Sequence, residues 1–269
     1  MTPSIFYSWQ SDSPEKGNRY FIRDCLLHIE KNLKLEDSLR VESDTSGVSG
    51  TPDIAATIFQ KIEDAEIAVF DVTPVGRAAD SPTLWQKWVP QSVTELFKHH
   101  RHFDKALPNP NVLIELGYAA RTIGWERIIC VMNIGYGHSP EELPFDLRSR
   151  RFPVCYSHSG NTKPPNEITK KAADELAKAI KSCLGHLHNQ VEQVFGKMNH
   201  QCLSLLQQVG QQESFAFLDG NLPPGMDRLL DLDIVWCHSI PANATYGYHW
   251  THLGRRVLEE FSRRQNAGI

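Results

Sequence analysis

Several features that define specialised protein classes are missing from this sequence of 269 residues. It has no uninterrupted apolar run of about 18 residues, the length that predicts a membrane-spanning helix, so we expect no membrane segment. The N-terminus has no basic region followed by an apolar stretch, so we expect no signal peptide and a cytoplasmic location. The net charge is only −4 at pH 7, which disfavours a broadly basic nucleic-acid binder.

The usual patterns of disulfides and metal ligands are also missing. The six cysteines are scattered along the chain, and none forms a CxxC pair. This predicts reduced thiols in a cytosolic protein and no zinc site. Three histidines gather at 99–102, but no cysteine or carboxylate spacing supports them as ligands. We therefore expect no metal.

Short apolar runs alternate with helical patterns over the first 156 residues. The periodicity predicts helices over 18–34, 51–65 and 111–123, and in the second of these Thr51 is the expected N-cap with Pro52 in the first turn. The predicted strands are 4–9, 39–44, 66–73, 127–133 and 153–157. Near-continuous apolar strands that alternate with helices indicate an α/β fold, with a parallel sheet covered by helices on both faces.

Two segments interrupt this alternation. Residues 74–108 are predicted to be a mostly helical insertion or lid. The polar stretch 157–170 contains glycine and two prolines, and a strongly helical segment follows over 168–187. We therefore predict a first domain over 1–160 and a helical linker with a second domain over 161–269.

The C-terminal part has its own pattern of a helix, two strands and a last helix over 226–261. This order resembles the end of a winged-helix domain. From His186 onward the chain has six Lys or Arg and eight Asp or Glu residues. Because phosphate contacts dominate DNA binding, this charge favours a protein-contact or oligomerisation module over nucleic-acid binding.

Polar residues follow several of the predicted strands. Ligands of open parallel sheets bind at the carboxyl ends of the strands, so we expect these residues to line one rim. The candidate ligand-binding residues are Ser8, Trp9, Asp44, Asp71 and Asn111.

Glu115 lies inside the otherwise apolar helical run "NPNVLIELGYAARTIG" at 109–124. It is close to the expected start of the helix, where the helix dipole favours an ionised carboxylate. Gly117 leaves space beside it for a ligand. Such a carboxylate suits the stabilisation of an oxocarbenium-like centre while a glycosidic bond breaks.

The same residues carry a resemblance that covers roughly residues 3–156. The segments "IFYSWQSD", "DTSGVSGTPDI", "IEDAEIAVFDVT", "NPNVLIELGYAARTIG" and "LPFDLRSRR" resemble bacterial TIR-like domains of antiphage systems. The block at 109–124 is also similar to nucleoside 2-deoxyribosyltransferase-like proteins. Both resemblances imply that Glu115 is the catalytic residue for cleavage of an N-glycosidic bond. The first also implies a TIR or flavodoxin-like sheet, NAD as the substrate rather than a cofactor, and activation by self-assembly.

Three hypotheses follow. The first is an NAD glycohydrolase of antiphage defence. It is activated by a protein partner or by assembly into an oligomer or filament, and the C-terminal part couples that event to activity. The second keeps Glu115 but acts on nucleosides or nucleotides. The third is a non-catalytic sensor that binds a nucleotide signal.

Overall fold

The computed structural model describes residues 4–32, 40–42, 53–77, 106–150, 153–210, 212–217, 222–240 and 245–268. The chain forms two compact units, Thr2–Ser182 and Cys183–Ile269. The boundary between them falls within one long helix, α6 (Asn166–Lys197). The sequence predicts a shorter helix there, over 168–187, and a domain boundary at 160.

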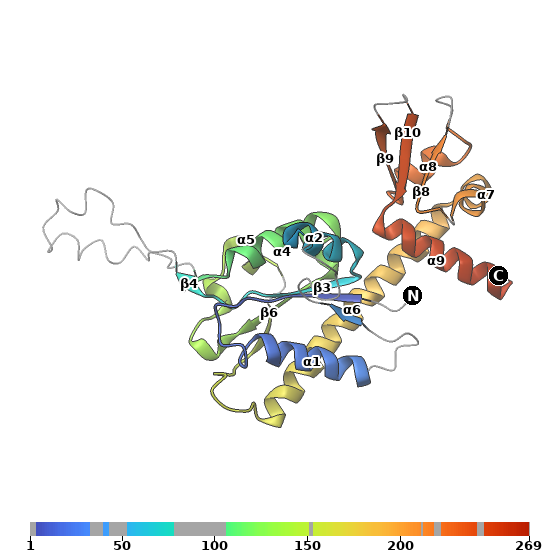
Figure 1. Ribbon diagram of the computed structural model, residues 1–269. Helices are drawn as coiled ribbons and strands as arrows, with labels where there is room; N and C mark the ends of the chain where they lie inside the picture. Colours follow the sequence, from blue (N-terminus) through green and yellow to red (C-terminus); the bar gives the residue numbers. More distant parts are fainter. Residues whose placement is uncertain are drawn as a thin grey trace, which may run out of the picture. The chain divides into compact units, whose positions relative to one another are not determined.

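The N-terminal unit is built on a five-stranded parallel sheet with the order β2-β1-β3-β6-β7 (Figure 1). The prediction of an α/β fold is confirmed. Each strand lies within a predicted range, and all five residues of the central strand β3 are buried. The strands are β1 (Ser4–Ser8), β2 (Arg40–Glu42), β3 (Ile67–Asp71), β6 (Ile128–Asn133) and β7 (Val154–Tyr156).

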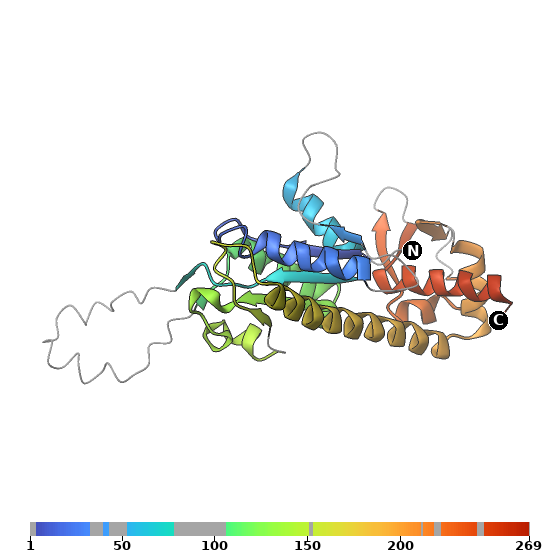
Figure 2. The ribbon, with the colours of Figure 1, turned by 90° about the horizontal axis from the view of Figure 1, so that it is seen from below.

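Helices cover both faces of this sheet. In the two perpendicular views α1 and the N-terminal part of α6 lie on one face, while α2, α4 and α5 lie on the other (Figures 1 and 2). The helices of this unit are α1 (Arg19–Asn32), α2 (Ile54–Asp64), α4 (Pro110–Thr122) and α5 (Phe145–Arg148), with short 3-10 turns η2 (Trp125–Arg127), η3 (Ile134–Tyr136) and η4 (Pro140–Glu142).

The helix α2 begins later than predicted. Its N-cap is Asp53, whose carboxylate accepts a hydrogen bond from the backbone N–H of Ala56 at 3.1 Å. The prediction of Thr51 as N-cap is therefore wrong. Thr and Asp are both favoured N-cap residues, so residue type alone does not distinguish Thr51 from Asp53.

One hydrophobic core fixes α2 and α4 against the sheet. Ile62 of α2 and Leu116 of α4 pack with Phe70 of β3 and are at most 2% exposed. Each side chain of this size contributes about 1.5–3 kcal/mol when it is fully buried. This packing holds the helix that carries Glu115.

The predicted insertion at 74–108 begins and ends in a two-stranded antiparallel pair, β4 (Gly76–Arg77) with β5 (Ala106–Leu107). The predicted helical lid itself falls on residues 78–105, which lie outside the described residues.

The C-terminal unit has an antiparallel sheet with the order β8-β10-β9 and its own core. The predicted helix, two strands and last helix are all present, whereas the strand β8 was not predicted. The winged-helix interpretation stays a prediction. The elements are α7 (His200–Val209), β8 (Ser214–Phe217), α8 (Met226–Asp231), β9 (Val235–Ile240), β10 (Thr245–Trp250) and α9 (His252–Ala267).

The last helix of this unit packs closely on the preceding chain. Thr251 caps α9 by accepting a hydrogen bond from the N–H of Gly254 at 3.0 Å. A Cβ at Gly254 would lie only 1.9 Å from the carbonyl oxygen of Ile234. Position 254 therefore requires glycine.

None of the helices in the described ranges is both long enough and apolar enough to cross a membrane.

Candidate active site

Two predicted site residues meet at the carboxyl edge of the parallel sheet. Ser8 is the last residue of β1, and its hydroxyl donates a hydrogen bond to Oε2 of Glu115 on α4 at 2.5 Å. Ser8 is 2% exposed, and Glu115 is half-buried. The pair links two segments 107 residues apart in the chain.

The electrostatics of Glu115 reflect its position between core and solvent. Burial raises the pKa of this carboxyl above its ordinary value, and the hydrogen bond from Ser8 opposes the rise. Glu115 is the sixth residue of α4 and lies beyond the first turn, so the helix dipole gives its charge little support. A carboxylate that is both desolvated and hydrogen-bonded is a common feature of functional sites.

Two other residues of α4, Asn111 and Gly117, are exposed. Gly117 is exposed, and a Cβ built there would have no atom within 4 Å. Asn111 is exposed in the first turn of the same helix, where its backbone N–H donates to the Asn109 cap at 2.8 Å. The Asn111 side chain is thus on the solvent side of α4, available to a ligand.

Trp9 follows Ser8 directly and is partly exposed. The guanidinium of Arg19 lies over its indole ring, 3.5 Å from the ring centroid. This cation–π contact holds the Trp9 ring against Arg19, the first residue of α1.

Asp71, another of the predicted ligand-binding residues, is the last residue of β3. It has no exposed surface, and its carboxylate accepts hydrogen bonds from Asn18 Nδ2 at 2.9 Å and from the backbone N–H of Thr73 at 3.0 Å. Burial raises its pKa, while these hydrogen bonds oppose the rise. In this structure Asp71 ties the end of β3 to the loop between β1 and α1.

Asn133, at the end of β6, extends this buried network. Its Nδ2 donates to the carbonyl oxygens of Gly17 at 3.1 Å and His158 at 2.6 Å. Its Oδ1 accepts from the N–H of Gly135 at 2.9 Å and of His158 at 3.1 Å. One side chain therefore joins the loops that follow β1, β6 and β7.

Further contacts fix the loop between β1 and α1 beside the site. Gln10 donates to the carbonyl oxygen of Thr73 at 2.8 Å. Asn109, the N-cap of α4, donates to the carboxylate of Asp12. The loop that begins next to Ser8 is thus joined both to β3 and to the helix that carries Glu115.

The sequence places Thr73 at the rim with Asp71, whereas it does not predict the network residues Asn18 and Asn133. For Asn133 the available signal was its position at the end of an apolar strand. The predicted ligand residue Asp44 lies outside the described residues. Where the structure is described, no group of three or more His, Cys, Asp or Glu side chains is placed to hold a metal ion.

Asp71→Asn should destabilise the N-terminal unit by about 1–3 kcal/mol, because one amide N–H would then face the donor of Asn18.

The raised native pKa of Asp71 determines the direction in which its contribution to stability changes with pH. The native state binds the Asp71 proton more tightly than the unfolded state, so this group favours folding most below its ordinary pKa and progressively less as pH rises through the native pKa.

Urea unfolding of the wild type and of Asp71→Asn, from below the ordinary pKa of an aspartate to above the native pKa of Asp71, would measure the difference in their free energies of unfolding. We expect the difference between the two free energies of unfolding to become smaller as pH rises. A difference in the free energy of unfolding that grows with pH would contradict the assigned direction of the Asp71 pKa shift.

No protein-family profile matches the chain, and no curated protein matches it. Among solved structures, a prokaryotic SEFIR domain is similar over 66% of this chain and 99% of that chain, with 17% identity and a TM-score of 0.34. Similarity at this level carries no inference about activity.

Proposed function

We propose that this protein is an NAD glycohydrolase that cleaves the nicotinamide–ribose bond, with Glu115 as its catalytic residue. The observation that carries the proposal is the 2.5 Å hydrogen bond from Ser8 to a half-buried Glu115 at the carboxyl edge of a parallel sheet. The resemblance of the 109–124 block to enzymes that cleave N-glycosidic bonds supports it.

In the proposed reaction the C1′–N bond of NAD breaks, and nicotinamide leaves with the bonding electron pair as a neutral molecule. The ribose is left with oxocarbenium character, and the ionised Glu115 stabilises this positive charge. Water then adds at C1′ and loses a proton, which gives ADP-ribose. Nicotinamide, ADP-ribose and one proton thus balance NAD and water.

Ser8 orients the carboxylate of Glu115 in this scheme. Trp9, the residue directly after Ser8, is the proposed stacking partner of the nicotinamide ring. Asn111 is placed for a polar group of the substrate. Asp71 holds the rim loops in position, since its carboxylate is fully buried.

The direct test is incubation of the purified full-length protein with NAD at high protein concentration, with nicotinamide followed by chromatography. We expect release of nicotinamide with an equal amount of ADP-ribose or a cyclised product. Release of free base from nucleosides, with NAD left intact, would instead establish the deoxyribosyltransferase-like activity. Binding of NAD without turnover, together with intact nucleosides, would favour the sensor.

Ser8→Ala should lower kcat/KM for NAD by roughly 10- to 100-fold, because Glu115 loses a hydrogen bond to its charged form. The same hydrogen bond lowers the pKa of Glu115, so its removal raises that pKa further. Because the ionised form is the active one, the acidic limb of the pH–rate profile should move to higher pH. A pH–rate profile with an unmoved acidic limb would show that Ser8 does not act through Glu115.

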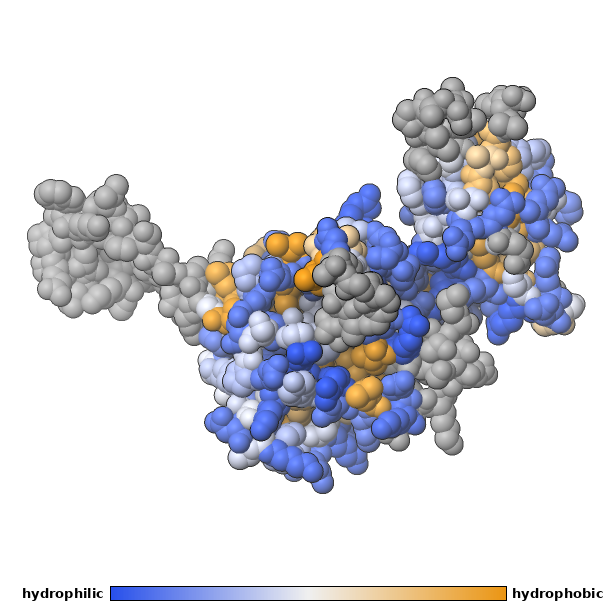
Figure 3. Space-filling view, in the orientation of Figure 1, coloured by the Kyte–Doolittle hydropathy of each residue, from blue (hydrophilic) through white to orange (hydrophobic). Residues whose placement is uncertain are grey.

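Assembly of copies, or binding of a protein partner, is the proposed means of activation. The large apolar side chains with the greatest exposure in the described ranges are Ile54, Ile114 and Phe145, at 61–63%. They lie on α2, α4 and α5, over which Figure 3 shows apolar surface. Ile114 is adjacent to Glu115, so a partner on this surface would contact the catalytic helix. A role in antiphage defence is supported by the resemblance.

A further inference from the structure

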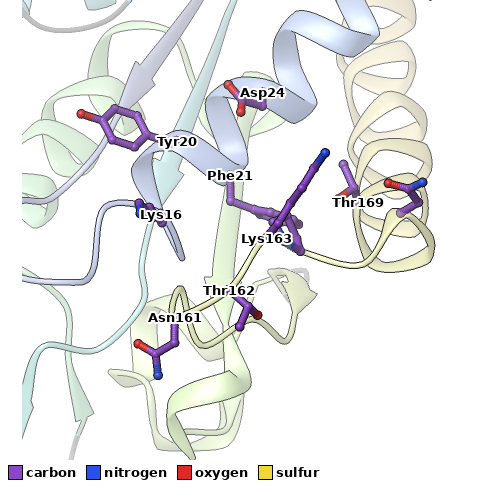
Figure 4. A pocket seen from close by; sticks show the side chains of 10 residues that line it. Lys16, Tyr20, Phe21, Asp24, Asn161, Thr162, Lys163 and Thr169 are labelled. Carbon is purple, nitrogen blue, oxygen red and sulfur yellow. The ribbon is translucent and has the colours of Figure 1, made fainter.

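A cavity lies in the N-terminal unit between α1 and the loop that joins β7 to α6. Its volume is about 470 Å³, within the range of about 300–1,000 Å³ that is usual for small-molecule sites. Figure 4 shows the side chain of Phe21 from α1 beside Lys163 of the loop that follows β7. Because α1 and α4 cover opposite faces of the sheet, this cavity is distinct from the Glu115 site (Figures 1 and 2).

The charges around the cavity favour an anion. Lys16 and Lys163 both line it and are both exposed. In the part of the chain that the structure describes, neither ammonium group has a carboxylate partner. The one acidic lining residue, Asp24, is already paired with Arg23 at 2.9 Å. The cavity is therefore locally positive in a chain whose net charge is −4.

The rest of the lining offers hydrogen-bonding groups. Two amides and two hydroxyls come from the β7–α6 loop and the start of α6, and Phe21 and Pro164 supply apolar surface. The polar set is Asn161, Thr162, Asn166 and Thr169. Neutral donors and acceptors in a cavity that two lysines also line suit a ligand that has several hydroxyls as well as a phosphate.

The two loops that form the cavity are held together below it. A Cβ at Gly160 would lie 2.8 Å from the backbone N of Gly17, so the two backbones touch. Asn133 bonds the carbonyl oxygens of Gly17 and His158, one from each loop. The cavity is thus fixed in the absence of a ligand, which reduces the cost of ordering it on binding.

We propose that this cavity binds a phosphorylated sugar, with the phosphate held by the lysines that line the cavity and the sugar hydroxyls on the amides and hydroxyls of the β7–α6 loop. The site is separate from NAD cleavage and does not depend on it. Its occupant contacts the loop that begins beside Ser8 and Trp9, so binding there is placed to influence the catalytic edge of the sheet.

Titration calorimetry of the full-length protein with ribose 5-phosphate at low ionic strength tests the proposal. We expect binding of one molecule per chain. The double variant Lys16→Ala/Lys163→Ala should bind at least tenfold more weakly, and neutral ribose should bind the wild type at least tenfold more weakly than its phosphate does.

The matched control is Lys170→Ala/Lys171→Ala, which removes two exposed lysines of α6 that do not line the cavity. It should bind as the wild type does, and so should Glu115→Gln. No binding to the wild type, equal losses in the two lysine variants, or a loss in Glu115→Gln alone would overturn the proposal. If inorganic phosphate binds as tightly as ribose 5-phosphate, the sugar contributes nothing to binding, and the proposal that the cavity recognises a sugar is overturned.

Discussion

Glu115→Gln should lower kcat/KM for NAD by about 10²–10³-fold, the usual effect of removing one group that stabilises charge in a transition state. Glutamine has nearly the same shape and its Oε1 still accepts the hydrogen bond of Ser8. Only the negative charge is lost. Because burial already raises the pKa of Glu115, removal of its charge costs the fold nothing near neutral pH.

The measurement is nicotinamide release by both proteins, with urea unfolding to show that the variant is folded. Glu167→Gln is a matched control, since Glu167 is exposed in the first turn of α6 and makes the same change of charge. It should retain full activity. A folded Glu115→Gln protein that cleaves NAD at the wild-type rate would end the assignment of Glu115 as the catalytic residue.

Gly254→Ala should destabilise the C-terminal unit by about 3 kcal/mol or more, at the upper end of the cost of overpacking. The new methyl group would meet the carbonyl oxygen of Ile234 at 1.9 Å and its carbonyl carbon at 2.9 Å. These are backbone atoms, and no side-chain rotation relieves the contact. α9 would have to move away from the chain before β9, which opens the core around Val257.

Hydrogen exchange along α9 in the full-length chain would detect this change as faster exchange of its amides. Gly196→Ala is the control, because position 196 is also helical and a Cβ there has no atom within 4 Å. That variant should gain roughly 0.5–1 kcal/mol from better helix propensity. Equal protection of α9 in wild type and Gly254→Ala would contradict the predicted clash.

The periodicity of the sequence was sufficient to predict the architecture of the N-terminal unit. The five parallel strands are short and apolar, so their pattern differs clearly from that of the amphipathic helices. Ser8 and Glu115 were predictable as neighbours because one ends a strand and the other lies near the start of a helix at the same edge.

The remaining features depend on spatial relations that no local pattern encodes. Asp71 is the last residue of a strand, as Ser8 is, so the sequence predicts the same kind of role for both. Only the approach of Asn18 from another segment makes Asp71 part of a buried network. Asn133 joins three loops only because β6 lies between β3 and β7. The cavity beside Lys16 likewise depends on α1 and α6 sharing a face.

The contact between Gly17 and Gly160 has an evolutionary consequence. Each backbone occupies the space that a side chain at the other position would need, and Gly160 also has a φ of +77° that L-residues rarely adopt. A substitution at either position forces the two loops apart, unless the other loop changes length in the same lineage. Across a family of related sequences, the two positions should therefore vary together or not at all, and insertions in one loop should be matched by insertions in the other.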